Sequence, residues 1–288
     1  MSSRLTTVLA AVGASGALIA GGLAFGGSPA SADTGNAVYD CTVLPGTTVP
    51  VNVTLTADLP ATSWPTHTPV PGGILTINGA FTVPEQVAQG LARQGIDEVG
   101  VGDNNFALSL GSASIPLTGV AADRTQVPAS GDLSLPFSAS IGTFTMPDAG
   151  SYFIAMPSAF NADLLTHTAQ GDSSIPQVPC TLDPSSTKNI TPFTVSKQSA
   201  TEKVSGPASV KKGQVAKYVI TVAGSVVKPT GKVVVKDGKK ALGTAAIKGG
   251  KATFSTKKLK AGKNKLTFSY AGDKNTGKAS ASKTVTVK

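Results

Sequence analysis

Apolar and polar residues alternate along short stretches of the C-terminal part of the chain. In the segment 214–222, one face carries only apolar side chains, namely Ala216, Tyr218, Ile220 and Val222. The opposite face includes Lys217 and Thr221, and this period of two is typical of a strand buried on one side. The pair Asp237-Gly238 lies between two extended runs and predicts a tight hairpin, because these residues tolerate the positive φ of such turns. About seven short strands of this kind, separated by turn residues and without a helical pattern, predict an antiparallel β-sandwich in the last ninety or so residues.

The residues before this sandwich are also predicted to be β-rich. Strand-like alternation occurs in the segments 48–58, 72–83, 104–110, 131–146 and 150–156. One short amphipathic helix is predicted between Pro84, which suits a first helical turn, and Gly95, which suits a helix exit. The expected fold is therefore all-β, with two β-sandwich-like domains, of which the first carries one short helix.

The N-terminal residues have the features of a secretory signal peptide. Arg4 precedes an apolar run from Leu5 to Phe25, and Ala30 and Ala32 form a small-residue cleavage site. We expect residues 1–32 to be removed and the mature protein to be secreted. The alternative is an uncleaved membrane anchor, because the run is nearly long enough to span a bilayer. No second apolar run of this kind follows, so no membrane span is expected after cleavage.

Cys41 and Cys180 are the two cysteines of the chain. In an oxidising compartment such a pair is expected to form one disulfide, which the chain-entropy description values at about 4 to 5 kcal/mol for a loop of this length. Two free thiols are the alternative. No cluster of further cysteines and histidines accompanies the pair, so we expect no zinc site and no other cofactor.

The charge changes sign along the chain. Residues 33–196 contain 3 basic and 13 acidic residues, a net charge of −10, whereas residues 197–288 contain 21 lysines and 3 acidic residues, a net charge of +18. Between them lies a stretch rich in Ser, Thr and Pro, a composition that suits an exposed connector. We therefore predict an acidic domain over 33–185, a linker over 186–202 and a basic domain over 203–288.

Several motifs of the basic domain occur in a characteristic order. They are G-x-V-x-V (231–235), LGTAAIKGGKATF (242–254), LKAG (259–262) and FSYAGD (268–273). With these motifs, residues 203–288 resemble the bacterial Ig-like repeat modules of secreted and surface proteins. The resemblance implies a spacer, adhesion or binding module, and it brings no catalytic residues with it.

The acidic domain carries a second set of motifs. They are YDCTV (39–43), PEQVAQGLARQG (84–95), FTMPDAGSYFIAM (144–156) and VPCTLDP (178–184). This set is similar to an uncharacterised domain of secreted actinobacterial proteins, in which the first and last strands carry the paired cysteines. The resemblance implies no known activity.

No arrangement of residues in the chain predicts an enzyme. Metalloprotease, P-loop, dinucleotide-binding and lipase-elbow signatures are absent from the sequence. Of the two histidines, His67 and His167, both are expected to be solvated loop residues. Some acidic residues could form the carboxylate pair of a secreted hydrolase, namely Asp97, Glu98, Asp103, Asp123, Asp132 and Asp148. Most of them adjoin Gly, Pro or Asn, so a role in turns is the preferred interpretation.

Trp64 is the single tryptophan and lies in the Pro-rich segment SWPTHTPVPGG. An exposed indole ring there could stack on a sugar, which would make the protein an extracellular carbohydrate-binding protein. The preferred interpretation is a lid over one end of the sandwich.

Five lysines of the segment 251–275 carry the strongest hint of a binding partner. They are Lys257, Lys258, Lys260, Lys263 and Lys265. Lysine without arginine suits diffuse attraction to a polyanion, here an anionic cell-wall polymer or a surface glycan, whereas specific nucleic-acid recognition would call for arginine and exposed aromatic rings. Solubility and protection of strand edges are the competing explanation.

The leading prediction is a secreted, non-catalytic attachment or scaffolding protein of the cell envelope. The chain ends in strand residues, TVTVK, without a sorting motif, so we expect non-covalent association with the wall.

Overall fold

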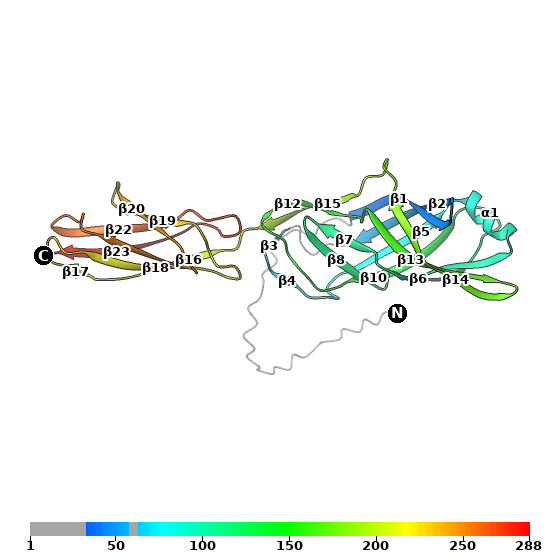
Figure 1. Cartoon of the computed structure of the whole chain (residues 1–288), viewed down its shortest axis with the longest axis horizontal. Helices are drawn as coiled ribbons and strands as arrows, with labels where there is room; N and C mark the ends of the chain where they lie inside the picture. Colours follow the sequence, from blue (N-terminus) through cyan, green and yellow to red (C-terminus); the bar gives the residue numbers. More distant parts are fainter. Residues whose placement is uncertain (1–32, 58–62) are drawn as a thin grey trace, which may run out of the picture.

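A computed structural model describes residues 33–57 and 63–288, and the predicted signal peptide, 1–32, lies outside them (Figure 1). The first domain is built from strands and one short helix. Its elements are β1 (Asp33–Leu44), β2 (Thr47–Ala57), β3 (Ser63–Pro65), β4 (Pro69–Val70), β5 (Thr76–Val83), α1 (Glu85–Arg93), β6 (Ile96–Asn104), β7 (Ala107–Leu110), β8 (Ala113–Thr118), β9 (Ala122–Gln126), β10 (Leu133–Ile141), β11 (Phe144–Thr145), β12 (Gly150–Ala155), β13 (Ala159–Thr168), β14 (Gly171–Leu182) and β15 (Asn189–Ser196).

One curved sheet forms the body of this domain. Its strand order is β3-β15-β12-β7-β8-β10-β5-β2-β1-β14-β13-β6-β9, and β4 pairs separately with β11. The eight neighbouring strands β10-β5-β2-β1-β14-β13-β6-β9 bend round until β9 contacts β10. Because β9 and β10 do not pair, these strands form an incompletely closed barrel. The halves of the sheet face each other across a shared core, which confirms the predicted sandwich-like, all-β domain.

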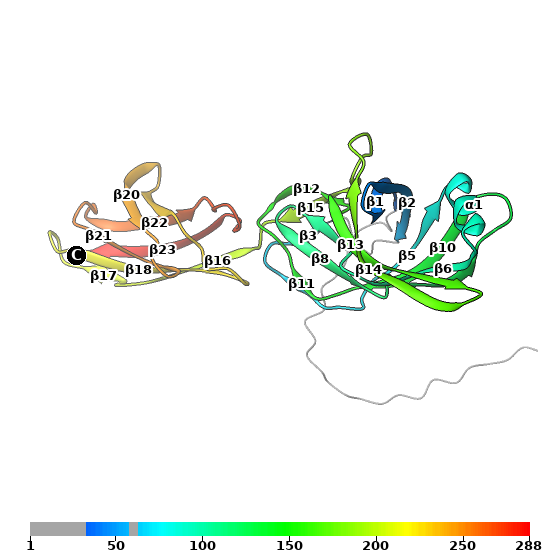
Figure 2. The same cartoon turned by 45° about the vertical axis from the view of Figure 1, so that its right-hand side comes forward.

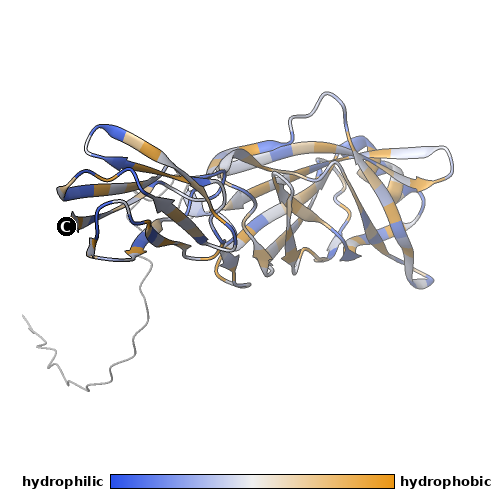
Figure 3. Cartoon of the chain, turned by 60° about the vertical axis from the view of Figure 1, so that its left-hand side comes forward, coloured by the Kyte–Doolittle hydropathy of each residue, from blue (hydrophilic) through white to orange (hydrophobic). Residues whose placement is uncertain are grey.

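Alternating burial explains why these segments form strands. Along β10 the buried residues include Leu133, Leu135 and Phe137, while the residues between them are exposed. Phe160 is the centre of the aromatic core, with ring centroids 5.0 Å from Tyr39 and 5.0 Å from Phe106. Figure 3 shows the same alternation as orange and blue residues along the strands.

Helix α1 confirms the one helix that the sequence predicts. It spans Glu85–Arg93, directly after Pro84, and Gly95 has a φ of 77°, the left-handed conformation that glycine adopts at a helix exit. Asp132 accepts a hydrogen bond of 2.9 Å from the backbone N–H of Glu85, so its carboxylate caps the helix start.

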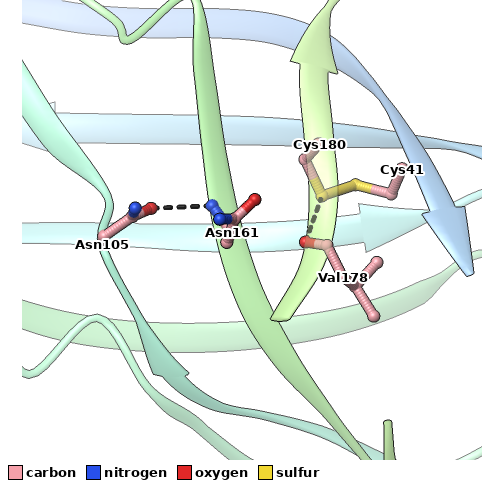
Figure 4. Close-up of a disulfide and its surroundings, with 5 residues drawn as sticks. All are labelled: Cys41, Asn105, Asn161, Val178 and Cys180. Carbon is pink, nitrogen blue, oxygen red and sulfur yellow. Dashed lines mark hydrogen bonds between the residues drawn. A yellow bond between two sulfur atoms is a disulfide. The ribbon is translucent and has the colours of Figure 1, made fainter. Parts of the chain in front are cut away.

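The predicted disulfide between Cys41 and Cys180 is present (Figure 4). It joins directly opposite residues of β1 and β14, in a ladder that runs from the pair Tyr39–Leu182 to the pair Cys41–Cys180. Beyond the disulfide, β1 continues with β2 alone and β14 continues with β13 alone. The bond therefore marks the point at which the two strands part.

The second domain is a two-sheet sandwich. Its strands are β16 (Ala200–Ser205), β17 (Ser209–Val210), β18 (Ala216–Gly224), β19 (Lys232–Asp237), β20 (Lys240–Ala246), β21 (Lys251–Thr256), β22 (Gly262–Tyr270) and β23 (Ala279–Val287). The sheets have the orders β16-β18-β21 and β17-β23-β22-β19-β20. Ala216, Tyr218, Ile220 and Val222 are buried as predicted, and Gly238, with a φ of 55°, closes the predicted hairpin.

The predicted linker, 186–202, is wrong over most of its length. Residues 189–196 form β15 inside the first domain, and β16 of the second domain already starts at Ala200. The reason is an alternation within this segment, because Thr191, Phe193 and Val195 are buried while Pro192 and Thr194 between them are exposed. The Ser-, Thr- and Pro-rich composition of this segment indicated a connector, but its alternation of buried and exposed residues makes it a strand.

Candidate functional site

The five predicted lysines lie together at the end of the second domain that is remote from the first domain. Lys257, Lys258 and Lys260 occupy the connection between β21 and β22, and Lys263 and Lys265 follow on the exposed face of β22. All five side chains are exposed, and we call them the lysine cluster.

A buried asparagine fixes the backbone that carries the lysine cluster. Asn264 is 2% exposed, although its neighbours along β22 are lysines. Its side chain accepts a hydrogen bond of 3.0 Å from the N–H of Lys260 and donates hydrogen bonds of 2.8 Å to the Lys260 carbonyl and 3.0 Å to the Gly262 carbonyl. The Thr256 hydroxyl also accepts the N–H of Lys258 at 3.0 Å. The loop is therefore tied to the domain core, and the lysine side chains radiate from a fixed backbone.

Further lysines extend the positive surface around the cluster. Lys211 and Lys212 precede β18, whose first residue, Ala216, pairs with Thr256 at the end of β21. The backbone N–H of Lys212 donates to the carbonyl of Lys288 at 2.8 Å, so the last residue lies at the same end.

The charges of this end are not neutralised by carboxylates. Among the described residues, the single lysine with an ion pair is Lys274, which lies at the opposite end of the domain. Glu202 and Asp273 also lie toward that opposite end, because Glu202 pairs with Val222 and Asp273 follows the last residue of β22. Asp237, in the β19–β20 hairpin, is the acidic side chain nearest to the cluster along the sheet, opposite Leu266.

Asp148 joins the two domains. Its carboxylate binds Lys274 Nζ through Oδ2, and through Oδ1 it accepts a hydrogen bond of 2.7 Å from Asn275 Nδ2 and lies 2.9 Å from His67 Nε2. The hydrogen bond from Lys274, followed by those from Asn275 and His67, holds the pKa of Asp148 well below its usual range. The carboxylate is therefore charged at all ordinary pH values.

Asn275 completes this junction with its other side-chain atom and with its backbone. Asn275 Oδ1 accepts a hydrogen bond of 2.9 Å from the N–H of Ala149, and the Asn275 carbonyl accepts one of 2.9 Å from the N–H of Gln198. Gln198 is 2% exposed, and its Oε1 accepts the N–H groups of Val226 and Val227. The short connection between β15 and β16 is thus anchored in the second domain, and the domains lie end to end (Figure 1).

The sequence did not predict the junction between the two domains or the contacts of the histidines. Both histidines are only partly exposed, and each one contacts a carboxylate: His67 contacts Asp148, and His167 Nδ1 lies 2.7 Å from Asp172 Oδ1. The predicted loop position is wrong for His167, which lies in β13, whereas His67 does lie in the loop between β3 and β4. The available signal for the junction was the position of GDKN, 272–275, in the connection after β22, at the end that faces the first domain.

The structure does not provide the exposed ring that a glycan contact at Trp64 requires. Trp64 is 9% exposed and pairs with Val195 in a parallel ladder between β3 and β15. Its ring lines an apolar cavity of about 70 Å³ together with Met146 and Phe193. The glycan-stacking hypothesis is wrong in this respect, because pairing with β15 turns the indole inward, where its apolar area is buried.

The acidic residues considered for hydrolysis are spread over separate elements. Asp97, Glu98 and Asp103 belong to β6 and Asp123 belongs to β9, whereas Asp132 caps α1 and Asp148 lies at the junction. Within residues 33–57 and 63–288, no group of three or more His, Cys, Asp and Glu side chains could hold a metal ion. In the same part of the chain, no helix is long and apolar enough to cross a membrane.

Two family models match the chain. The family of unknown function DUF6801 matches residues 38–191, and the bacterial Ig-like domain (group 3) matches residues 203–288. The second match confirms the Ig-like resemblance, and the first covers the segment that resembles an uncharacterised domain. No curated protein matches the chain.

Solved structures similar to the chain include fibronectin(III)-like modules and an Ig ectodomain. The fibronectin(III)-like modules of Clostridium thermocellum CbhA are 14% identical, cover 81% of this chain and 94% of their own, and give a TM-score of 0.30. The full ectodomain of mouse nectin-like molecule 4 is 14% identical, covers 74% of this chain and 59% of its own, and gives a TM-score of 0.24.

Proposed function

Because the chain belongs to the DUF6801 family of unknown function and continues into a bacterial Ig-like domain, we propose that it is a non-catalytic attachment protein of the bacterial exterior. The lysine cluster binds anionic wall polymers and holds the protein there without a covalent bond. A disulfide and an Ig-like domain are both typical of extracellular proteins, and Ig-like folds typically serve as interaction or spacer modules.

The observation that carries this proposal is a lysine cluster without neutralising partners. Five exposed ammonium groups project from a backbone that Asn264 fixes, and none forms an ion pair among the described residues. Solubility alone would be served by lysines of any placement. The five lysines of the cluster lie together at one end of an elongated domain, so they raise the local potential where a polyanion would dock.

The acidic domain does not cancel this potential. β22 has 9 residues and spans about 30 Å at about 3.3 Å per residue, with the lysine cluster at its start and the junction beyond its end. That length is several times the Debye length of about 8 Å at physiological ionic strength. The lysine cluster therefore acts on a polymer almost independently of the net charge of the first domain.

The test is sedimentation of the purified mature protein with isolated bacterial cell walls over a salt series. Binding is expected at about 0.02 M salt and release by about 0.5 M salt, because both partners are exposed. Walls stripped of their anionic polymers should bind the protein weakly at every salt concentration.

Two variants that lose the same number of positive charges distinguish the effect of where the lysines lie from the effect of net charge. The first replaces Lys257, Lys258, Lys260, Lys263 and Lys265 by Gln. The second replaces five exposed lysines near the junction end by Gln, namely Lys228, Lys232, Lys248, Lys251 and Lys278. Loss of five charges at the cluster should weaken binding by at least about tenfold, and the second variant should lose less than about threefold. Equal losses in both variants, or wall binding that ignores salt, would refute the role of the cluster.

A further inference from the structure

The first domain contains an apolar cavity that the attachment role does not use. Its volume is about 230 Å³, and it lies between helix α1 and the strands of the partly closed barrel. Val87 and Leu91 of α1 form one wall, and the facing walls include Val49, Val51 and Ile175. These five aliphatic side chains point into the domain, yet each remains only partly buried, because the space in front of it is not filled by protein.

The cavity lies next to the place where the sheet opens. β1 and β14 pair up to Cys41 and Cys180 and then part, and side chains from both separated ends line the cavity. On one side these are Val43 and Leu44, and on the other Ile175 and Val178. Leu44 is 59% exposed, so this side chain lies at the open side of the cavity. Figure 2 shows the β1–β2 hairpin and the β13–β14 hairpin as separate projections near α1.

Water is a poor occupant of such a space. A buried water needs two to four polar partners, and a purely apolar cavity of about 150 Å³ stays dry and takes up small apolar molecules. The present cavity is larger and is lined mainly by aliphatic and aromatic side chains, together with the disulfide and a few polar residues. A hydrocarbon chain would regain the contacts that these walls lack.

One charged residue borders the cavity but does not place its charge inside it. Asp163 Oδ1 accepts the N–H of Gln177 at 2.8 Å in an exposed hydrogen bond. The Asp163 side chain lies with that of Leu165 on the outer face of β13, since a Cβ at Gly102 would meet both of them. The residues of β13 that face the cavity alternate with these two, and no lysine or arginine lines the cavity.

From this arrangement we infer that the cavity binds one aliphatic chain of a neutral amphiphile. The chain fills the space beneath α1 and enters between the separated ends of β1 and β14. A neutral head is favoured over an anionic one such as a carboxylate, because no lysine or arginine lines the cavity and the surrounding domain has a net charge of −10.

The test uses the full mature chain with Nile red, an uncharged apolar dye whose fluorescence rises in apolar surroundings. Monodecanoylglycerol should displace the dye, and decanoate should be at least about tenfold weaker, because its carboxylate finds no cation at the cavity and is repelled by the acidic domain. Phosphatidylcholine vesicles form a further arm, which detects adsorption to a lipid surface.

A matched pair of variants locates the binding site. Val49→Trp places a large ring in the cavity, and Thr48→Trp places the same ring on the exposed face of the same strand. The first should weaken Nile red binding by at least about tenfold, while the second should change it by less than about twofold. Thermal unfolding shows whether each variant is folded, and if Val49→Trp is not, Val51→Phe replaces it. Equal binding by both variants, preference for decanoate, binding to vesicles alone, or no binding at all would each overturn the inference.

Discussion

Glu202 allows a direct test of the second domain, because its carboxylate faces inward. It lies on β16, an edge strand that pairs only with β18, and it occupies the same phase as Ala200 and Val204, which pack against the core. Both carboxylate oxygens are inaccessible to solvent, and Glu202 forms no ion pair among the described residues. An inward charge on an edge strand discourages pairing with other chains, at a cost in stability.

Burial raises the pKa of Glu202 to about 7, while the backbone amide of Tyr270 acts in the opposite direction. A raised pKa means that the folded protein binds this proton more tightly than the unfolded chain. The free energy of unfolding therefore falls as the pH rises from the ordinary value of 4.5 through about 7, and it levels off above that. The full difference corresponds to about 3 kcal/mol, and solvent screening of this partly exposed side chain reduces it to about 1 to 2 kcal/mol.

Glu202→Gln removes the titrating group and keeps the shape of the side chain. We expect the variant to gain about 1 to 2 kcal/mol over wild type at about pH 8 and almost nothing at about pH 5. The assay is urea unfolding followed by the near-ultraviolet circular dichroism of the buried Tyr218 and Tyr270. Trp64 fluorescence in the same samples reports the first domain, whose transition should not move. An equal gain at both pH values, or none at either, would refute the assignment of the cost to a buried charge.

Three further substitutions test the core, the lysine loop and the junction. Gly79→Ala should destabilise the first domain by about 1 to 3 kcal/mol in urea unfolding, because a Cβ there would lie 2.4 Å from the Phe137 ring and 2.6 Å from the Thr54 carbonyl. Asn264→Ala should cost the second domain about 1 to 3 kcal/mol by the same measurement, because buried backbone groups lose their partners. Asn275→Ala should broaden the range of domain orientations in small-angle X-ray scattering while leaving both unfolding transitions in place, because it removes contacts to the first domain only at the junction.

Much of the fold follows from the two-residue alternation of apolar and polar side chains, because this alternation decides which side chains are buried. The second domain was predictable for this reason, since Tyr218, Phe268 and their neighbours are buried while the lysines between them are exposed. The helix and the disulfide were predictable from local signals, namely Pro84 and Gly95 at the helix ends and an even pair of cysteines.

The junction and the cavity were not predictable in this way. His67 and Asn275 are 208 residues apart and meet through hydrogen bonds, which leave no periodic trace in a sequence. Val49 and Val51 alternate just as Val53 and Leu55 do on the same strand, yet the first pair lines a cavity and the second pair is buried in the core. Periodicity shows which way a side chain points, and it carries no information on whether another side chain meets it there.

The position of the two proposed sites leads to a final prediction. The lysine cluster and helix α1 lie at opposite ends of the molecule, because the anchored connection around Gln198 holds the domains end to end (Figure 1). A protein retained by its lysine cluster would keep the cavity directed away from the polymer, so neither ligand should interfere with the other.

The variants already described test this independence in a crossed design. The variant with Gln in place of the five cluster lysines should bind Nile red as wild type does while losing wall sedimentation. Val49→Trp should show the reverse, with normal sedimentation and dye binding weakened by at least about tenfold. If either change moved both readouts by a similar factor in protein that remains folded, the two sites would be coupled through the junction. Asn275→Ala, which loosens that junction, would then be expected to abolish the coupling.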